Sequence, residues 1–423
     1  MEQKPFTILI LLALFSSALF SIITPMAKEL TEALNLSSQE QVAYINSIFL
    51  MVGAFSSLVW AVLADKFSRK KLLIIATLEW SIFTLLTIFS YDYYSFLLFQ
   101  ILTGIGFGSA LPLTYSLTVD LFESFQRGSK FGTLSAIYVL GNGVGQMLSG
   151  FLIDYYTWQI PLLIISISGF LCTFLLLSMV EPKKGEKDLK FQGPDEAAFE
   201  IDYKIKMEDL KQIWKIKSTL LILIFNFVLF VAVGAVSSFL ISMFKNDFLL
   251  SSTIATILLI LIFGSQIPSG IFFGKLGDKI YQREENGRIK ILLFCVILGS
   301  IIYIFAYSAV LINREISTII FFIIMFFTGA FMFGATDPLS QATLGEINPP
   351  QIRSTIYSLN YLGTTFGRSI SLLFLGSFFT SFNKQYIPGY LILSFLALLS
   401  SLIVIPILKF LPQDLERIKN KKL

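Results

Sequence analysis

Twelve apolar stretches dominate this chain of 423 residues, and each is long enough to cross a membrane as a helix. A membrane-crossing helix needs about 20 mostly apolar residues. Segments inside a bilayer fold as helices because no water is present to bind their backbone polar groups. The stretches are Phe6–Ala27, Val42–Leu63, Leu72–Ser90, Tyr94–Leu117, Phe131–Ile153, Ile160–Val180, Thr219–Met243, Ser251–Gly274, Ile289–Ile312, Ser317–Leu344, Ile356–Thr380 and Pro388–Leu411. The sequence therefore predicts an all-α polytopic membrane protein with twelve transmembrane helices.

The composition supports this fold class and excludes several kinds of chemistry. Hydrophobic residues make up 55% of the chain and charged residues 14%, whereas about a quarter of a soluble protein is charged. The chain has no histidine, and its two cysteines, Cys172 and Cys295, lie far apart in apolar stretches. We therefore expect no metal site and no disulfide framework. No nucleotide-binding loop or nucleophile arrangement is present, so we expect no cofactor and no enzymatic activity.

The basic residues indicate the orientation of the chain. If the N-terminus is placed inside the cell, 27 of the 32 Lys and Arg residues lie in inner loops or termini, four lie in outer loops, and Arg368 lies within a stretch. Short loops rich in Lys and Arg stay in the cytoplasm. We therefore expect both termini to be cytoplasmic. We also expect the protein to be a monomer in the plasma membrane, surrounded by lipid. The net charge of +4 reflects this orientation, and we expect no nucleic-acid partner.

The chain divides at one long polar segment. Residues 181–218 separate an N-terminal part with six stretches, 1–180, from a C-terminal part with six, 219–411, which a short cytoplasmic tail, 412–423, follows. Within the polar segment, 207–217 places Leu210, Ile213 and Trp214 on one helical face with lysines around it. This pattern predicts a short amphipathic helix on the inner leaflet; the alternative is a solvated linker.

An internal repeat relates the two parts, in two registers. The first register aligns Phe107 with Phe333. It also pairs Gly108 with Gly334, Pro112 with Pro338, Leu113 with Leu339, Asp120 with Glu346, Arg127 with Arg353, Gly141 with Gly367 and Gly150 with Gly376. In the second register, which aligns Leu63 with Leu276, Leu63–Lys66 falls on Leu276–Lys279. Six helices repeated in parallel describe two pseudo-symmetric halves of a transporter.

The loop after the second stretch carries a family signature. Leu63–Lys71 reads LADKFSRKK and resembles the motif G-x-L-A-D-R/K-x-G-R-R/K of the major facilitator superfamily, with Ala61 and Ser68 in place of the two glycines. Gly274–Lys279 resembles the start of the same motif. The resemblance covers nearly the whole chain. It implies the major facilitator fold, in which two six-helix halves alternately expose a central site to each side of the membrane.

Charged residues near the predicted cytoplasmic surface form a candidate gating motif. Asp65 suits the positive N-terminal end of a helix, and the resemblance places the start of the eleventh helix there, near 354–357. Arg69 can then pair with Asp120, and the repeat places Asp278 near 130–133 at the start of the fifth helix. We interpret these charges as a latch; the alternative is that they only enforce topology. The motif comprises Asp65, Lys66, Arg69, Asp120, Arg127, Gly274, Asp278, Glu346 and Arg353.

Charged residues also lie inside the predicted helices. A charge at the bilayer centre costs about 2.5–3.5 kcal/mol, so it needs a cavity or a partner. Asp337 and Arg368 lie at depths that an arginine side chain can bridge, and they form either a transport site or a permanent structural pair. Glu79 lies on the third helix, which is peripheral in the family. Uncharged candidates for the central cavity are Tyr115, Asn142, Gln146, Asn226, Gln266 and Gln341, each of which can equally bond to another helix.

The leading functional hypothesis is secondary active transport of a small organic solute, for which an anion would suit Arg368. A proton is the expected coupling ion, carried by Asp337. An exporter of amphiphiles, lysolipids or drugs is an alternative, because Gly141–Gly150 is similar to an element of exporters, although Gln146 replaces its proline. A membrane sensor that binds a ligand without moving it is an alternative from another class.

Overall fold

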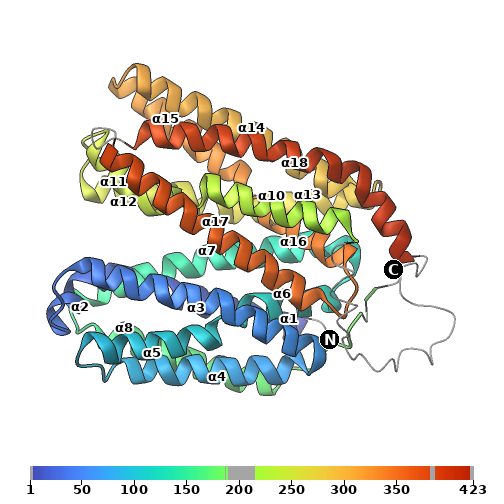
Figure 1. Cartoon of the computed structure of the whole chain (residues 1–423), viewed down its shortest axis with the longest axis horizontal. Helices are drawn as coiled ribbons and strands as arrows, with labels where there is room; N and C mark the ends of the chain where they lie inside the picture. The colour runs from blue at the N-terminus through green and yellow to red at the C-terminus, as the bar shows by residue number, and fades with distance from the viewer. Residues whose placement is uncertain (1–2, 186, 189–214, 382–385, 420–423) are drawn as a thin grey trace. The chain divides into compact units, whose positions relative to one another are not determined.

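The computed structural model describes residues 3–185, 187–188, 215–381 and 386–419, and in these residues all regular secondary structure is helical (Figure 1). Residues 207–214 of the predicted amphipathic helix lie outside the described residues, so that helix stays a prediction. The first part of the chain contains α1 (Gln3–Ser21), η1 (Thr24–Met26), α2 (Ala27–Ala33), α3 (Gln39–Lys66), α4 (Arg69–Thr87), α5 (Tyr93–Phe107), α6 (Ala110–Leu121), η2 (Ser124–Gln126), α7 (Arg127–Leu152) and α8 (Gln159–Leu177).

The second part of the chain has a matching series. It contains α10 (Lys217–Val233), α11 (Val236–Asn246), α12 (Ser252–Gly264), α13 (Gln266–Tyr281), α14 (Gly287–Ile312), α15 (Ile316–Phe333), α16 (Thr336–Ile347), α17 (Arg353–Ser381) and α18 (Ile387–Lys419). The last helix, α18, continues beyond the predicted end at Leu411. Its extension is packed, because Asp414 accepts a hydrogen bond from the Ser218 N–H at 2.9 Å and Leu415 is buried.

Each predicted stretch corresponds to one helix or to a run of consecutive helical segments, which confirms the twelve-helix fold. Among the described residues, eight helical segments are individually long and apolar enough to cross a membrane. They are Gln3–Ala33, Gln41–Lys66, Tyr93–Leu121, Gln159–Leu177, Ile254–Tyr281, Gly287–Ile312, Ile316–Ile347 and Ile387–Arg417. The other predicted stretches correspond to α4, α7, α17 and the pair α10 and α11.

The repeat seen in the sequence is also present in the helix boundaries. Both α5 and α15 end at a phenylalanine followed by glycine, Phe107 and Phe333, and these two residues define the first repeat register. The same register superimposes the bounds of α6 on those of α16 and the start of α7 on the start of α17. A side chain at Gly108 would meet Ser56 Oγ at 2.2 Å, so glycine there permits close approach of α3.

The helices form two compact units. Unit 1 contains residues 1–123, 137–206 and 350–362, and unit 2 contains residues 124–136, 207–349 and 363–423. The start of α7 therefore belongs to unit 2 and the rest of α7 to unit 1. Conversely, the start of α17 belongs to unit 1 and the rest of α17 to unit 2. The units differ from the sequence halves 1–180 and 219–411 by these two exchanged segments.

In unit 1, α4 packs against α5 and α8, and α3 packs against α5 (Figure 1). Small residues bring α7 close to α1, because a side chain at Gly141 would meet the Leu14 carbonyl oxygen at 2.4 Å. Ser17 donates a hydrogen bond across the same contact to the Tyr138 carbonyl at 2.6 Å. Gly141–Gly150 thus contributes close helix packing, which is the general use of small residues between membrane helices.

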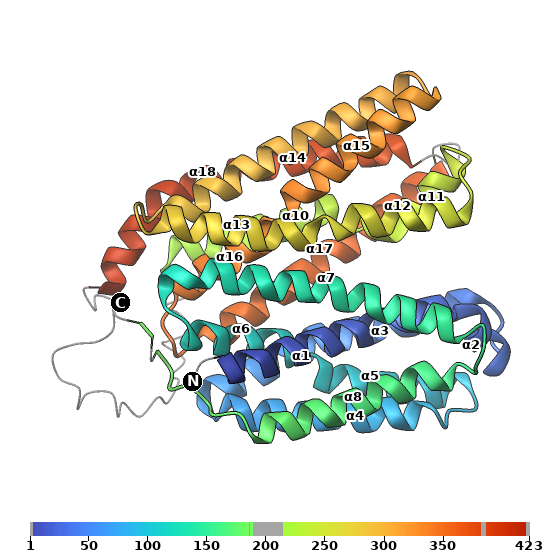
Figure 2. The same ribbon diagram turned by 180° about the vertical axis from the view of Figure 1, so that it is seen from behind.

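In unit 2, α14 packs against α15 and α18, and α10 packs against α18 (Figure 2). Stacked aromatic rings fill the space between α14 and its neighbours, with ring centroids 4.6 Å apart for Tyr303 and Phe326 and 5.4 Å apart for Tyr307 and Tyr390. Part of the unusually high phenylalanine content, 43 residues, therefore forms the core of this unit.

Candidate gating clusters and polar sites

Asp65, in the last turn of α3, binds the first turn of α17. Its carboxylate accepts hydrogen bonds from the Ser354 N–H at 3.2 Å, the Thr355 N–H at 3.1 Å and the Thr355 hydroxyl at 2.5 Å. The first N–H groups of a helix have no partner within the helix, and they form its positive end. A buried carboxylate there accepts hydrogen bonds from those N–H groups, and the positive helix end compensates its negative charge.

Asp120, at the end of α6, lies between two arginines from different helices. Arg69 donates to one oxygen of its carboxylate, and Arg353 donates to the other at 2.9 Å. All three side chains are buried. Because hydrogen bonds between charged groups are about twice as strong as neutral ones, this arrangement fixes the ends of α4, α6 and α17 together.

The segment after α8 crosses the same cluster; we call residues 181–185 with 187–188 the α8 strap. Glu181 accepts a hydrogen bond from the Arg69 N–H at 2.8 Å, and the Gly185 N–H donates to Asp120 at 3.0 Å. Asp188 binds Arg353 at 2.5 Å. Gly185 has a positive φ of 72°, and a side chain there would meet Pro350 at 2.9 Å, so glycine is required.

Lys184 of the α8 strap contacts the end of α3. Its Nζ donates to the Ala64 carbonyl at 2.9 Å and to the Asp65 carbonyl at 2.6 Å. Burial, reinforced by repulsion from Arg69, lowers the pKa of Lys184 to about 8. The sequence of Glu181–Gly185, EPKKG, resembles the E-P-x-R-G ending of the sixth helix in spinster-like and several other branches of the superfamily. That resemblance did not predict the contacts of the strap with Arg69, Asp120 and Arg353.

Unit 2 contains the counterpart of the Asp65 contact. Asp278 of α13 accepts hydrogen bonds from the Gly128 N–H at 2.9 Å and the Ser129 N–H at 2.6 Å, in the first turn of α7. The repeat in the sequence predicted this contact near 130–133, slightly further along the chain. The observed position lets Gly128 pack directly on Gly274, where a side chain would meet the Gly128 carbonyl oxygen at 2.3 Å.

The remaining motif residues also pair according to the repeat. Arg127, at the start of α7, binds Glu346 of α16 at 2.8 Å. In the first repeat register, the counterpart of this pair is Arg353 with Asp120. Asp278 also accepts a hydrogen bond from Arg288 at 2.6 Å. Arg288 is not part of the predicted gating motif. The side chain of Lys66 is exposed at the end of α3.

The two charged cavity candidates both lie in unit 2. Asp337, in the first turn of α16, accepts hydrogen bonds from the Ser135 hydroxyl and from Gln341 Nε2, the latter at 2.9 Å. The guanidinium of Arg368 lies 5.7 Å from the ring centroid of Phe230, within the range of a cation–π contact. Both side chains are partly exposed. Their role in binding a substrate stays a prediction.

The uncharged candidates are divided between the units. In unit 1, the buried Tyr115 ring makes edge-on contacts with Tyr138 and Tyr357 at centroid distances of 6.2 and 5.5 Å. The backbone carbonyl of Asn142 accepts a hydrogen bond from Ser21 at 2.8 Å, whereas its side-chain Oδ1 is buried without a hydrogen-bond partner among the described residues. Gln146 is exposed.

In unit 2, Asn226 of α10 accepts a hydrogen bond from Ser340 of α16 at 3.3 Å. Gln266, at the start of α13, packs against Gly334. The structure thus groups Asp337 with Gln341 on one side of α16 and places Asn226 at Ser340. Helix packing thus accounts for a polar contact of the Asn226 side chain.

The fold and its paired clusters define a polytopic helical membrane protein with two repeated halves. The sequence profile of the Major Facilitator Superfamily matches residues 9–283 and 222–422. The chain therefore belongs to the Major Facilitator Superfamily, a family of membrane transporters.

Several known proteins are similar to this chain. It is 30% identical over 154 residues to the candidate niacin/nicotinamide transporter NiaP of Bacillus subtilis, a match that covers 36% of this chain and 38% of NiaP. The human organic anion transporter MFSD10 has a similar fold, with a TM-score of 0.72, 14% identity, and coverage of 95% of this chain and 99% of that one. The proton:xylose symporter XylE also has a TM-score of 0.72, with 16% identity and 95% coverage of both chains.

Proposed function

We propose that this protein is a secondary active transporter of a small organic anion, coupled to protons, that works by alternating access. The observation that carries the proposal is the pair of equivalent carboxylates, Asp65 and Asp278. Each of them binds the first turn of a helix, α17 or α7, whose remaining part belongs to the other unit.

These contacts suit a reversible latch. In each contact a carboxylate accepts hydrogen bonds from the start of a helix. Arg69 and Arg353, which bind Asp120, belong to the Asp65 cluster, and Arg288 binds Asp278 itself. When the clusters separate, α7 and α17 are released at their starts, and the two sequence halves, 1–180 and 219–411, can move as bodies. We place these clusters on the cytoplasmic side, as the distribution of lysines and arginines indicates.

Asp337 and Arg368 are the proposed coupling and binding groups. Both are partly exposed in unit 2, and an ionisable residue within a membrane helix is by default a candidate functional site. Two similar proteins are described as transporters of niacin or nicotinamide and of organic anions. Niacin is a carboxylate, a group that a guanidinium binds well. We propose that Arg368 binds the anionic group and that Asp337 takes up and releases the proton.

The substrate class is tested by thermal stabilisation of the purified chain with nicotinate and other organic anions, neutral sugars, lysolipids and cationic drugs. An anion should stabilise the wild type and the control Arg417→Gln, whose side chain is exposed, but not Arg368→Gln. Equal stabilisation of the wild type and Arg368→Gln by lysolipids or drugs, with no effect of anions, would instead favour an exporter of amphiphiles.

Coupling is tested in proteoliposomes that carry the stabilising anion. Asp337→Asn should abolish uptake driven by a pH gradient and retain exchange of labelled for unlabelled anion, because exchange needs no net proton movement. Unchanged gradient-driven uptake would exclude Asp337 as the proton carrier. A ligand that binds but is never moved, in either assay, would identify a sensor.

A further inference from the structure

The α8 strap holds the start of α17 at a place separate from the Asp65 contact. Asp188 binds the Arg353 guanidinium at 2.5 Å, and Gly185 packs directly on Pro350. Both of these partners come from the C-terminal sequence half, whereas the strap continues from α8 of the N-terminal half. The strap therefore joins the two sequence halves within unit 1, which contains all of these residues.

The strap is also bound to the ends of three N-terminal helices. Glu181 accepts a hydrogen bond from the first N–H of α4, and Lys184 donates to two carbonyls at the end of α3. The Gly185 N–H donates to Asp120 at the end of α6. The strap thus lies between these helix ends and the start of α17, and it is bonded to both.

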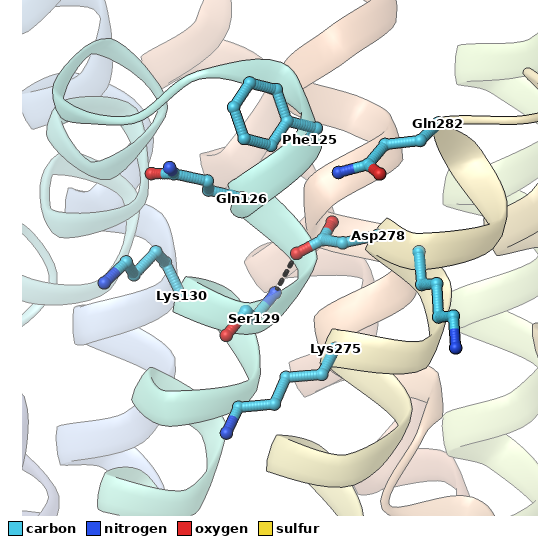
Figure 3. A pocket seen from close by; sticks show the side chains of 8 residues that line it. Phe125, Gln126, Ser129, Lys130, Lys275, Asp278 and Gln282 are labelled. Carbon is cyan, nitrogen blue, oxygen red and sulfur yellow. Dashed lines mark hydrogen bonds between the residues drawn. The ribbon is translucent and has the colours of Figure 1, made fainter.

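The Asp278 contact has no comparable strap among the described residues. Like α8 in the N-terminal half, α18 is the last helix of the C-terminal half, but it continues as a helix to Lys419. Its Asp414 accepts a hydrogen bond from Ser218 at the start of α10. Asp278 borders a cleft of about 440 Å³, where Figure 3 shows its carboxylate turned toward Ser129. The strap is therefore an addition to one of two otherwise equivalent contacts.

This addition opposes any movement that draws the start of α17 away from unit 1. Such a movement separates Asp188 from Arg353, and both side chains are almost fully buried. Separation of buried opposite charges costs more than separation of an exposed pair. We call the contacts of Asp65 with α17 and of Asp278 with α7 the cytoplasmic gate. If both contacts open together, as in alternating access, a clasp on one of them controls both.

We propose that the α8 strap is an inhibitory clasp on the cytoplasmic gate, which opens only after Asp188 has released Arg353. The proposal rests on the alternating access proposed above, because a clasp regulates only a contact that opens. It adds a regulatory part to that gate. A change that draws the strap off Arg353 favours opening, and a change that fixes the strap there opposes it.

The test is hydrogen–deuterium exchange of the purified full-length chain, measured by mass spectrometry without any substrate. Backbone amides exchange when a segment opens, so the segments 350–362 and 124–136 report the two contacts of the gate. Asp188→Ala should raise exchange roughly tenfold in both segments, because a hydrogen bond between charged groups is lost. The strap does not touch 124–136, so a response there requires that the two contacts open together. Helices α5 and α15 should keep their wild-type exchange.

The control is Asp154→Ala, which removes an exposed aspartate elsewhere in unit 1 and should change neither segment. Every other pattern would overturn the proposal. A rise in 350–362 alone would mean that the strap only caps the start of α17. A rise in all helices would mean that it only stabilises the fold. Wild-type exchange in both segments would mean that it restrains nothing.

A second variant disturbs the strap without removing a charge, and it decides the question if Asp188→Ala does not fold. Gly185→Ala places a side chain at a φ of 72°, where its Cβ would meet Pro350 at 2.9 Å. It should raise exchange in the same two segments. Its matched control is Gly150→Ala, whose Cβ would meet nothing within 4 Å.

Transport measurements separate this proposal from the proposed function. If the wild type moves an anion in proteoliposomes but only 350–362 responds to Asp188→Ala, transport stands and the clasp is wrong. If no anion is moved but both segments respond together, the clasp stands and the proposed transport is wrong.

Discussion

The Arg127 guanidinium lies 2.8 Å from the carboxylate of Glu346, and both side chains are almost fully buried. The two residues come from different sequence halves, 219 positions apart, yet they share unit 2. Their repeat counterparts, Arg353 and Asp120, form a second buried pair in unit 1. A buried ion pair is costly to form and more costly to break, because removal of one partner leaves an uncompensated charge.

Glu346→Gln should therefore destabilise the protein by about 3–5 kcal/mol. The double variant Arg127→Met with Glu346→Leu should recover most of this loss, because it removes both charges together. The measurement is unfolding of the purified protein in detergent. Glu284→Gln, in the exposed pair with Lys290, is the control and should change stability by less than about 1 kcal/mol. A Glu346→Gln effect no larger than the control would show that the buried pair is dispensable.

The lowered pKa of Lys184 predicts a pH dependence of stability. The pKa is about 8 in the folded protein and 10.5 for an ordinary lysine. Between these values the unfolded chain binds more protons than the folded one, so stability should rise as the pH increases from about 8 to 10.5. The melting temperature of the wild type should therefore increase, relative to that of Lys184→Met, over this window.

Other groups titrate in the same window, so the informative quantity is the difference between the two proteins. Parallel melting curves of the wild type and Lys184→Met at every pH would mean that Lys184 is not buried against α3. Lys71→Met, which replaces an exposed lysine near the same cluster, serves as the control. Its melting temperature should change with pH in the same way as that of the wild type.

Two glycines of α7 should respond in opposite ways to replacement by alanine. A side chain at Gly132 would meet the Gly270 carbonyl oxygen at 2.2 Å, whereas a side chain at Gly150 would meet nothing within 4 Å. Gly132→Ala should cost about 1–3 kcal/mol through overpacking. Gly150→Ala should stabilise the helix by up to about 1 kcal/mol. Thermal unfolding measures both, and equal changes in the two variants would contradict the close contact of α7 and α13.

Glu79 should be replaceable without loss of stability. Its Oε2 is buried and has no hydrogen-bond partner among the described residues. A Cβ atom added at Gly106 would lie 1.9 Å from this Oε2 atom, so the Glu79 carboxylate occupies the space beside Gly106. An unsatisfied buried acceptor costs about 1–3 kcal/mol, so Glu79→Leu should preserve or raise the melting temperature. A clear decrease would instead show that the fold depends on this carboxylate.

The sequence predicted the parts of the fold that follow from hydrophobic length and repetition. Twelve apolar stretches indicated the helices, and the first repeat register placed Asp120 and Glu346 at equivalent helix ends. The contact of Asp65 with the start of α17 came from family resemblance and helix electrostatics. A single sequence carries these signals because each is local or periodic.

The features that the sequence did not predict depend on tertiary contacts without a periodic pattern. The α8 strap has no hydrophobic repeat, so Lys184 and Asp188 looked like ordinary linker charges. The break between α5 and α6 was hidden inside the single predicted stretch Tyr94–Leu117. Arg288 lies in the first turn of α14, directly after a connection that differs in length between the repeats, which concealed its place beside Asp278.

The hydrogen bond between Asp65 and Ser354 joins residues 289 positions apart within unit 1. A ribosome that has just finished the first six helices has not yet made residues 350–362, which complete that unit. Until then Asp65, Asp120 and Arg69 lie at the membrane surface without the start of α17 that later packs against them. Nascent chains halted in the second half should therefore be protease-sensitive at the α3–α4 turn, and resistance should appear only once α17 has been synthesised.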